Sequence, residues 1–148
     1  MVKLRTILLA EDNPKDVELT LEAFSGYNLS NRIMVVPDGV EALEYLRYQG
    51  KYNNRKNGDP AVVVLDIKMP RMDGIELLRN IRSDPKLKML PVVILSSSRE
   101  EPDLKKCYGL GVNAYVVKPV QFKDFIEAVR NLGVFWALLN EPPPEKGE

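Results

Sequence analysis

Short apolar runs, separated by segments with helical spacing, are the most regular feature of this sequence. The runs span residues 6–10, 33–36, 61–65, 92–95 and 114–117 and are rich in Val, Ile and Leu. They do not alternate with polar residues, which is typical of strands buried on both faces. Between them, apolar residues recur three or four positions apart, as in Val17, Leu21 and Phe24, and this spacing predicts helices.

The regular alternation of strands and helices predicts a doubly wound α/β domain, in which helices cover both faces of a five-stranded parallel sheet. A final helix is predicted to start near Gln121 and to carry Phe122 and Phe125 inward. Residues 49–60 are rich in Asn, Gly and Lys without a period, and they predict a solvated loop. We assign residues 1–132 to one domain and residues 133–148 to an apolar, then proline-rich, C-terminal extension.

Composition excludes several classes of function. Basic and acidic residues each number 21, so no basic surface suggests nucleic acid as a partner. Cys107 is the only cysteine and there is no histidine, which argues against an internal disulfide, against Ser-His-Asp or Cys-His catalysis, and against a phosphohistidine donor. No run approaches the roughly 18 apolar residues of a membrane span. We therefore expect a cytoplasmic protein that does not bind the membrane.

Acidic, hydroxyl or basic residues follow four of the predicted strands. Glu11 and Asp12 follow the first strand, Asp66 the third, residues 96–98 the fourth, and Lys118 the fifth. Ligands of doubly wound sheets bind at the carboxyl ends of the strands. Carboxylates that converge there would repel each other unless a hard cation lay among them. Mg²⁺, which binds a few carboxylates and keeps several waters, is the expected ion.

Each of these residues also has an ordinary structural explanation. Asp12 or Asn13 suits a helix cap before Pro14. Asp66 could be a turn residue and Lys118 a solvated charge. Ser96 could be a hydroxyl satisfied in the core, and Tyr115 a ring packed on its strand. We favour a shared site, because four strand ends in the right order are hard to ascribe to chance.

Four segments closely resemble the receiver domains of two-component response regulators. They are AEDN at 10–13, LDIKMPRMDG at 65–74, PVVILSS at 91–97 and GVNAYVVKP at 111–119, and the resemblance covers roughly residues 4–132. It implies a flavodoxin-like fold with strand order 2-1-3-4-5. The segment GVFWALLNEPPP at 133–144 is similar, more narrowly, to the single-domain regulators that accompany phytochrome-type histidine kinases in cyanobacteria and other bacteria.

The resemblance implies a role for each site residue. Asp66 would accept the phosphoryl group, and Mg²⁺ would be held by Asp12, by Asp66, by Glu11 largely through water, and by the main-chain carbonyl of Lys68. Lys118 and Ser96 would stabilise the phosphoryl oxygens. Ser96 and Tyr115 would form the switch that responds to phosphorylation. Lys68 and Ser98 would tune the reaction rate.

The implied function is that of a single-domain response regulator. It would receive its phosphoryl group from a histidine kinase, expected to be of the phytochrome type, and would signal through a partner protein or a phosphorelay. It would not be an enzyme, beyond catalysing its own phosphorylation and dephosphorylation.

Three other functions agree less well with the sequence. Phosphohydrolases of the haloacid dehalogenase type need a second Asp two residues after the nucleophile, where this chain has Lys68. A receiver-like binding module without phosphorylation is disfavoured, because every site position holds a competent residue. A flavin-binding module is disfavoured, because a rim of carboxylates would repel the flavin phosphate.

The C-terminal extension predicts a homodimer. Its residues 134–139 include five large apolar side chains, among them Phe135, Trp136, Leu138 and Leu139. We expect them to join the face of the fourth helix, fifth strand and fifth helix in an interface, since an exposed patch of that size would invite aggregation. The alternative is that the final helix continues and packs these residues against its own domain.

Overall fold

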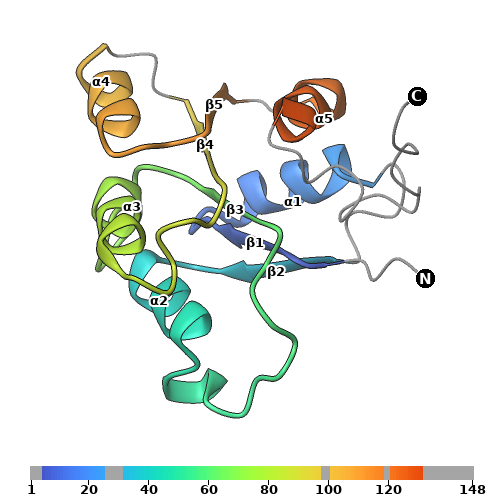
Figure 1. The fold of residues 1–148 in the computed structure, drawn as a ribbon. Coiled ribbons are helices and arrows are strands. Elements are labelled where there is room, and N and C mark those ends of the chain that lie inside the picture. The colour runs from blue at the N-terminus through green and yellow to red at the C-terminus, as the bar shows by residue number, and fades with distance from the viewer. Residues whose placement is uncertain (1–4, 26–31, 98–100, 119–120, 132–148) are drawn as a thin grey trace, which may run out of the picture.

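A five-stranded parallel sheet forms the centre of the molecule (Figure 1). The structure, a computed structural model, describes residues 5–25, 32–97, 101–118 and 121–131. Its strands lie in the order β2-β1-β3-β4-β5, which confirms the predicted topology. The strand bounds are β1 Ile7–Ala10, β2 Ile33–Val36, β3 Val62–Leu65, β4 Val92–Ser96 and β5 Ala114–Val117.

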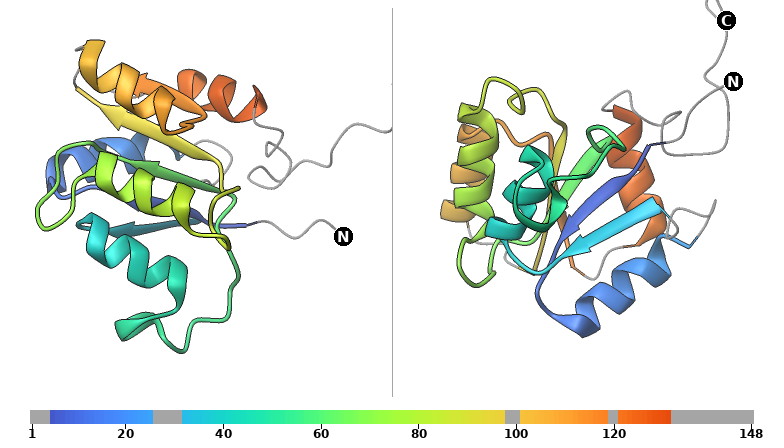
Figure 2. Two further views of the ribbon diagram at one scale, coloured as in Figure 1. Left: turned by 60° about the vertical axis from the view of Figure 1, so that its left-hand side comes forward. Right: turned by 90° about the horizontal axis from the view of Figure 1, so that it is seen from below.

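Helices cover both faces of the sheet, as Figures 1 and 2 show. One face carries α1 and α5, and the other carries α2, α3 and α4. The helix bounds are α1 Pro14–Ala23, α2 Gly39–Arg47, α3 Gly74–Ser83, α4 Glu101–Gly109 and α5 Phe122–Asn131, with a short 3₁₀ helix, η2, at Gly50–Tyr52. Within the described residues, no helix has the length and apolar character needed to cross a membrane.

The two faces have separate cores, and this explains why the strands read as unbroken apolar runs. In β1, Leu8 and Ala10 pack into the core under α2, α3 and α4. Ile7 and Leu9 pack on the opposite side, with Phe24 and with Phe125 of α5. Both sets are buried, because a parallel sheet covered on both faces has no solvent side for polar residues.

The register of the sheet brings the polar strand ends together. Ala10, the last residue of β1, pairs with Val36 and with Leu65. Ser96, at the end of β4, pairs with Val117 of β5. The residues that follow these strands therefore leave the sheet at one common edge.

Residues 49–60 are more ordered than the sequence indicates. They include η2, and the Arg55 guanidinium lies between the rings of Tyr45 and Tyr48, 3.9 and 4.0 Å from their centroids. Arg55 Nε also donates to the carbonyl of Tyr45 at 2.9 Å. Cation–π packing has no sequence period, so hydrophobic spacing does not reveal it.

Candidate functional site

Three carboxylates meet at the carboxyl edge of the sheet. Glu11 and Asp12 follow β1, Asp66 follows β3, and each offers an oxygen within 4.8 Å of the others. The sheet itself positions two of them: Glu11 N donates to Val36 O at 2.9 Å, and Asp66 N donates to Ala10 O at 3.0 Å. The pairing of the strands thus continues into the site, and it brings together the acidic residues that the sequence predicted.

The environment of this group leaves negative charge that a cation would relieve. Glu11 and Asp66 are 2% and 9% exposed, whereas Asp12 is open to solvent. Burial and the nearby Asp66 carboxylate raise the pKa of Glu11, despite its contact with Lys118. A hard divalent cation binds carboxylate oxygens and keeps water ligands where the site is open to solvent. These three residues therefore have the composition of a divalent metal site.

Asn13, rather than Asp12, caps the helix that follows. Asn13 Oδ1 accepts hydrogen bonds from Lys15 N at 2.9 Å and Asp16 N at 3.3 Å, and Pro14 opens α1. This arrangement satisfies the free amides of the first helical turn. Asp12 is not needed as a cap, so its carboxylate remains available to a ligand.

Lys118 reaches the same site from the end of β5. Its ammonium donates to Glu11 Oε1 at 2.5 Å, to Asp16 Oδ2 at 2.9 Å and to Asp66 Oδ2 at 3.3 Å. Burial by itself would lower the pKa of this lysine, but its carboxylate partners outweigh that effect and raise the pKa. These partners favour the charged form of Lys118 beside Asp66, at the strand end where the sequence places this lysine.

Asp16 is a site residue that the sequence reasoning missed. An acidic residue in the first turn of a helix is usually explained by the helix dipole, so its presence there carried no functional signal. A usable signal was its place in the turn that directly follows the acidic strand end. Side chains of a first turn lean toward the start of the helix and thus toward the site.

The loop from β3 to α3 closes tightly around Asp66. Gly74 N donates to Ile67 O at 2.7 Å, and a Cβ at Gly74 would lie 2.1 Å from the carbonyl oxygen of Asp66. Within the same loop Arg71 has a positive φ of 65° and forms an ion pair with Asp38, Nε to Oδ2, at 3.0 Å. Asp38 also caps α2 through Glu41 N, so the loop is tied to a second helix.

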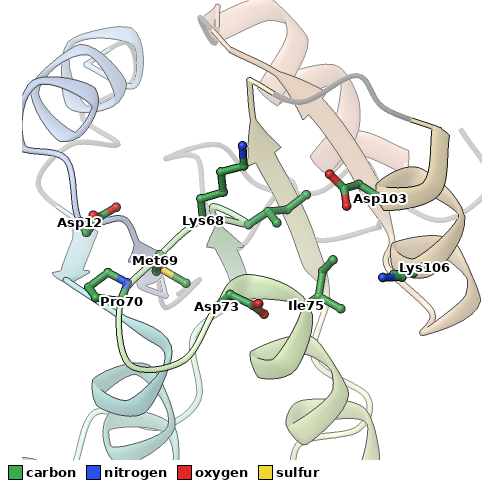
Figure 3. A pocket seen from close by; sticks show the side chains of 9 residues that line it. Asp12, Lys68, Met69, Pro70, Asp73, Ile75, Asp103 and Lys106 are labelled. Atoms are coloured by element: carbon green, nitrogen blue, oxygen red, sulfur yellow. The ribbon is translucent and has the colours of Figure 1, made fainter.

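A pocket of about 680 Å³ opens beside Asp12 (Figure 3). The β3–α3 loop and α4 contribute most of its wall, and Lys68 stands between the sides formed by Asp12 and Asp103 (Figure 3). The pocket has space for a phosphorylated group to approach the carboxylates. Its lining residues are Asp12, Ile67, Lys68, Met69, Pro70, Asp73, Ile75, Asp103 and Lys106.

The other predicted residues are placed in part. Tyr115 lies in β5, partly buried, and packs against the core under α2, α3 and α4. The backbone of Ser96 ends β4 at the same edge as the carboxylates. The predicted residues that lie outside the described part of the chain are Ser98, Phe135, Trp136, Leu138 and Leu139.

Comparison with known proteins decides the family. The profile of the response regulator receiver domain matches residues 7–130. The chain belongs to this family. Receiver domains are signalling modules. The match confirms the resemblance seen in the sequence, and the acidic edge and Lys118 described above agree with it.

The relatives include regulators linked by name to phytochromes. The chain is 35% identical over 132 residues to the response regulator Rcp1 of Synechocystis, covering 89% of this chain and 88% of Rcp1. It is 57% identical to the bacteriophytochrome response regulator AtBRR, with a TM-score of 0.84, covering 94% of this chain and 99% of that one. It is 37% identical to the phosphorylated cyanobacterial phytochrome response regulator RcpA, with a TM-score of 0.74, covering 96% and 99%. Rcp1 has also been solved in an Mn²⁺-bound form, which is 34% identical with a TM-score of 0.73, covering 95% and 99%.

Proposed function

We propose that Asp66 accepts a phosphoryl group from a histidine kinase in the presence of Mg²⁺. The observation that carries this proposal is the placement of the Asp66 carboxylate, 3.3 Å from the Lys118 ammonium and grouped with the Glu11 and Asp12 carboxylates. In the transfer, an Asp66 oxygen forms a bond to phosphorus while the phosphorus–nitrogen bond of the donor phosphohistidine breaks. The electron pair of that bond leaves with the imidazole nitrogen.

The residues of the site have complementary tasks in this reaction. Glu11, Asp12, Asp66 and the carbonyl of Lys68 would hold Mg²⁺, which supplies positive charge against the phosphoryl oxygens. Lys118 supplies a second positive charge, 3.3 Å from Asp66 Oδ2. Phosphoryl transfer depends mainly on position and on charge neutralisation, so no further acid or base is required.

The signal would pass through Ser96 and Tyr115. A hydroxyl at the end of β4 is suited to donate a hydrogen bond to a new phosphoryl oxygen. Tyr115 lies on the neighbouring strand, where it pairs with Ile94. Movement of the two side chains would change the face formed by α4, β5 and α5. This is a local electrostatic event that biases a two-state element.

We infer that the donor is a phytochrome-type histidine kinase and that the output is a partner protein or a phosphorelay. The likeness to AtBRR and RcpA, both named for phytochrome systems, supports the first inference. The neutral overall charge supports a protein partner over nucleic acid.

Lys68 and Ser98 are proposed to set the lifetime of the phosphoryl group. Lys68 is exposed, lines the pocket beside Asp12 (Figure 3), and lies two residues after Asp66. Rates of autodephosphorylation of the Lys68→Ala and Ser98→Ala variants would test this role, and unchanged rates in both would reject it.

The proposed reaction is tested with radiolabelled acetyl phosphate, a small donor that needs no kinase. The wild type should be labelled in Mg²⁺ and unlabelled after chelation, and Asp66→Asn should stay unlabelled in both. Label on Asp66→Asn at the wild-type level would refute the assignment. Steady turnover of small phosphomonoesters would instead favour a phosphohydrolase.

A further inference from the structure

Asp16 is a carboxylate of the site that has no part in the roles assigned above. Its Oδ2 lies 2.9 Å from Lys118 Nζ, closer than the 3.3 Å that separates Lys118 Nζ from Asp66 Oδ2. The Asn13 cap fixes the first turn of α1 and so fixes the backbone of Asp16. The contact with Lys118 therefore joins the capped start of α1 to the lysine that follows β5.

The hydrogen-bonding capacity of Lys118 shows why this contact matters. An ammonium has three N–H donors, and the three carboxylate partners are Glu11, Asp16 and Asp66. Glu11 and Asp66 also belong to the group that could hold a metal ion, and Asp16 does not. A cation bound there competes with Lys118 for Glu11 and Asp66. Of the three partners, only Asp16 would then be left to hold the lysine.

We propose that Asp16 is a positioning residue that anchors the Lys118 ammonium, so that one N–H keeps pointing at Asp66 and at the phosphoryl group formed there. This inference rests on the proposed function, because it assigns Asp16 a task in the same reaction. Asp16 itself does not touch the phosphoryl group. It acts by limiting where the lysine can go.

The test compares wild type, Asp16→Ala and Asp16→Asn in labelling by acetyl phosphate at saturating Mg²⁺. A small donor is used because α1 is exposed and a kinase could contact it. Asp16→Ala should be labelled about tenfold more slowly, as expected for loss of one charge-assisted hydrogen bond. Asp16→Asn keeps an oxygen acceptor, so its labelling rate should lie between the rates of Asp16→Ala and the wild type. Glu18→Ala, which removes the same charge from an exposed position of α1, should match the wild type.

Two further readouts separate anchoring from a structural or metal-binding role. The Lys118 ammonium, followed by nitrogen NMR relaxation, should become more mobile in Asp16→Ala, a change confined to this lysine that a merely structural role would not cause. The Mg²⁺ dissociation constant, measured without donor, should change by less than about fivefold, because Asp16 lies outside the metal group.

A wild-type labelling rate and an unchanged order of the Lys118 ammonium in Asp16→Ala would overturn the inference. An equal loss of Mg²⁺ affinity and of labelling rate would also overturn it, by assigning Asp16 to the metal. If the wild type itself took no Mg²⁺-dependent label, the proposed function would fail, and the inference with it. That case is recognised from the wild type alone.

Discussion

Asp12 and Asn13 are neighbours in the chain, but they have different tasks. Asn13 caps α1 through its side-chain oxygen, while the Asp12 carboxylate is exposed beside the pocket. The sequence allowed either residue to be the cap, since both types favour that position. Only the direction of the two side chains separates a structural residue from a ligand.

Replacing Asp12 with Ala should weaken Mg²⁺ binding by about tenfold or more, because one of the three proposed carboxylate ligands is lost. The metal-free variant should also be more resistant to urea than the wild type, because repulsion within the carboxylate group falls. Titration calorimetry measures the first effect and denaturant unfolding the second. Asp59→Ala, which removes an exposed carboxylate before β3, is the control. Equal Mg²⁺ affinity in Asp12→Ala and wild type would count against the site.

The ionisation of Asp38 should make the free energy of unfolding depend on pH in the acid range. Burial raises its pKa, but hydrogen bonds from Glu41 N and Arg71 outweigh burial and lower the pKa below 3.8. Because the folded-state pKa is the lower one, the stabilisation is fully present above about pH 4 and is lost as the pH falls through the folded-state value.

The measurement is the difference in unfolding free energy between wild type and Asp38→Asn across pH. The difference should be constant from pH 8 to pH 5, at about 1 kcal/mol in favour of the wild type, since Arg71 is largely solvated. It should shrink at lower pH. A difference that stays constant to the lowest pH at which both variants fold would contradict this account.

Among the elements, the strands follow the sequence most closely. Each predicted strand agrees with an observed one to within one residue at either end, because strands that helices cover on both faces are apolar on both. The helix α3 ends at Ser83 with Asp84 as its C-cap, directly before Pro85. By contrast, η2 and the Arg55 stacking were missed, since they depend on contacts between aromatic and cationic groups distant from any periodic pattern.

Gly74 controls how α3 packs against the end of β3. A Cβ at this position would meet the backbone carbonyl of Asp66 at 2.1 Å, and a backbone atom cannot move aside as a side chain can. Gly74→Ala should therefore lower the unfolding free energy by about 1 to 3 kcal/mol. It should also slow labelling by acetyl phosphate, because Asp66 would shift.

The matched control is Gly109→Ala. A Cβ at Gly109 meets nothing within 4 Å, and the residue ends α4, so alanine there should be neutral or slightly stabilising. Thermal unfolding of both variants provides the comparison. Equal melting temperatures for Gly74→Ala and the wild type would show that the backbone contact is unimportant.

For the molecule as a whole, the sequence predicted the layers and the position of the site. Both follow from the alternation of strands and helices along the chain and from the residues that directly follow each strand, and both features can be read in the sequence. The contact between Asp16 and Lys118 was not predicted, because it depends on the angle at which α1 leaves β1. Sequence spacing carries no information about that angle.

The proposed homodimer belongs to this scale. Residues 133–148 lie outside the described part of the chain, so the proposal rests on the apolar content of Phe135, Trp136, Leu138 and Leu139. Two buried aromatic side chains are sufficient to strengthen an interface by several kcal/mol, roughly. Sedimentation of the full chain should give a dimer at micromolar concentration, and a chain ending at Leu132 should give a monomer. A monomeric full chain, with and without phosphorylation, would end the proposal.

Transfer of a phosphoryl group from a phosphorylated phytochrome-type histidine kinase tests the central claim most directly. The wild type and two variants, Asp66→Asn and Asp73→Asn, are each mixed with the labelled kinase and Mg²⁺. Asp73 caps α3 in the same loop, and asparagine caps equally well, so this variant controls for loss of a nearby carboxylate. We predict label on the wild type and Asp73→Asn and none on Asp66→Asn. Label on Asp66→Asn at the wild-type level would contradict the account.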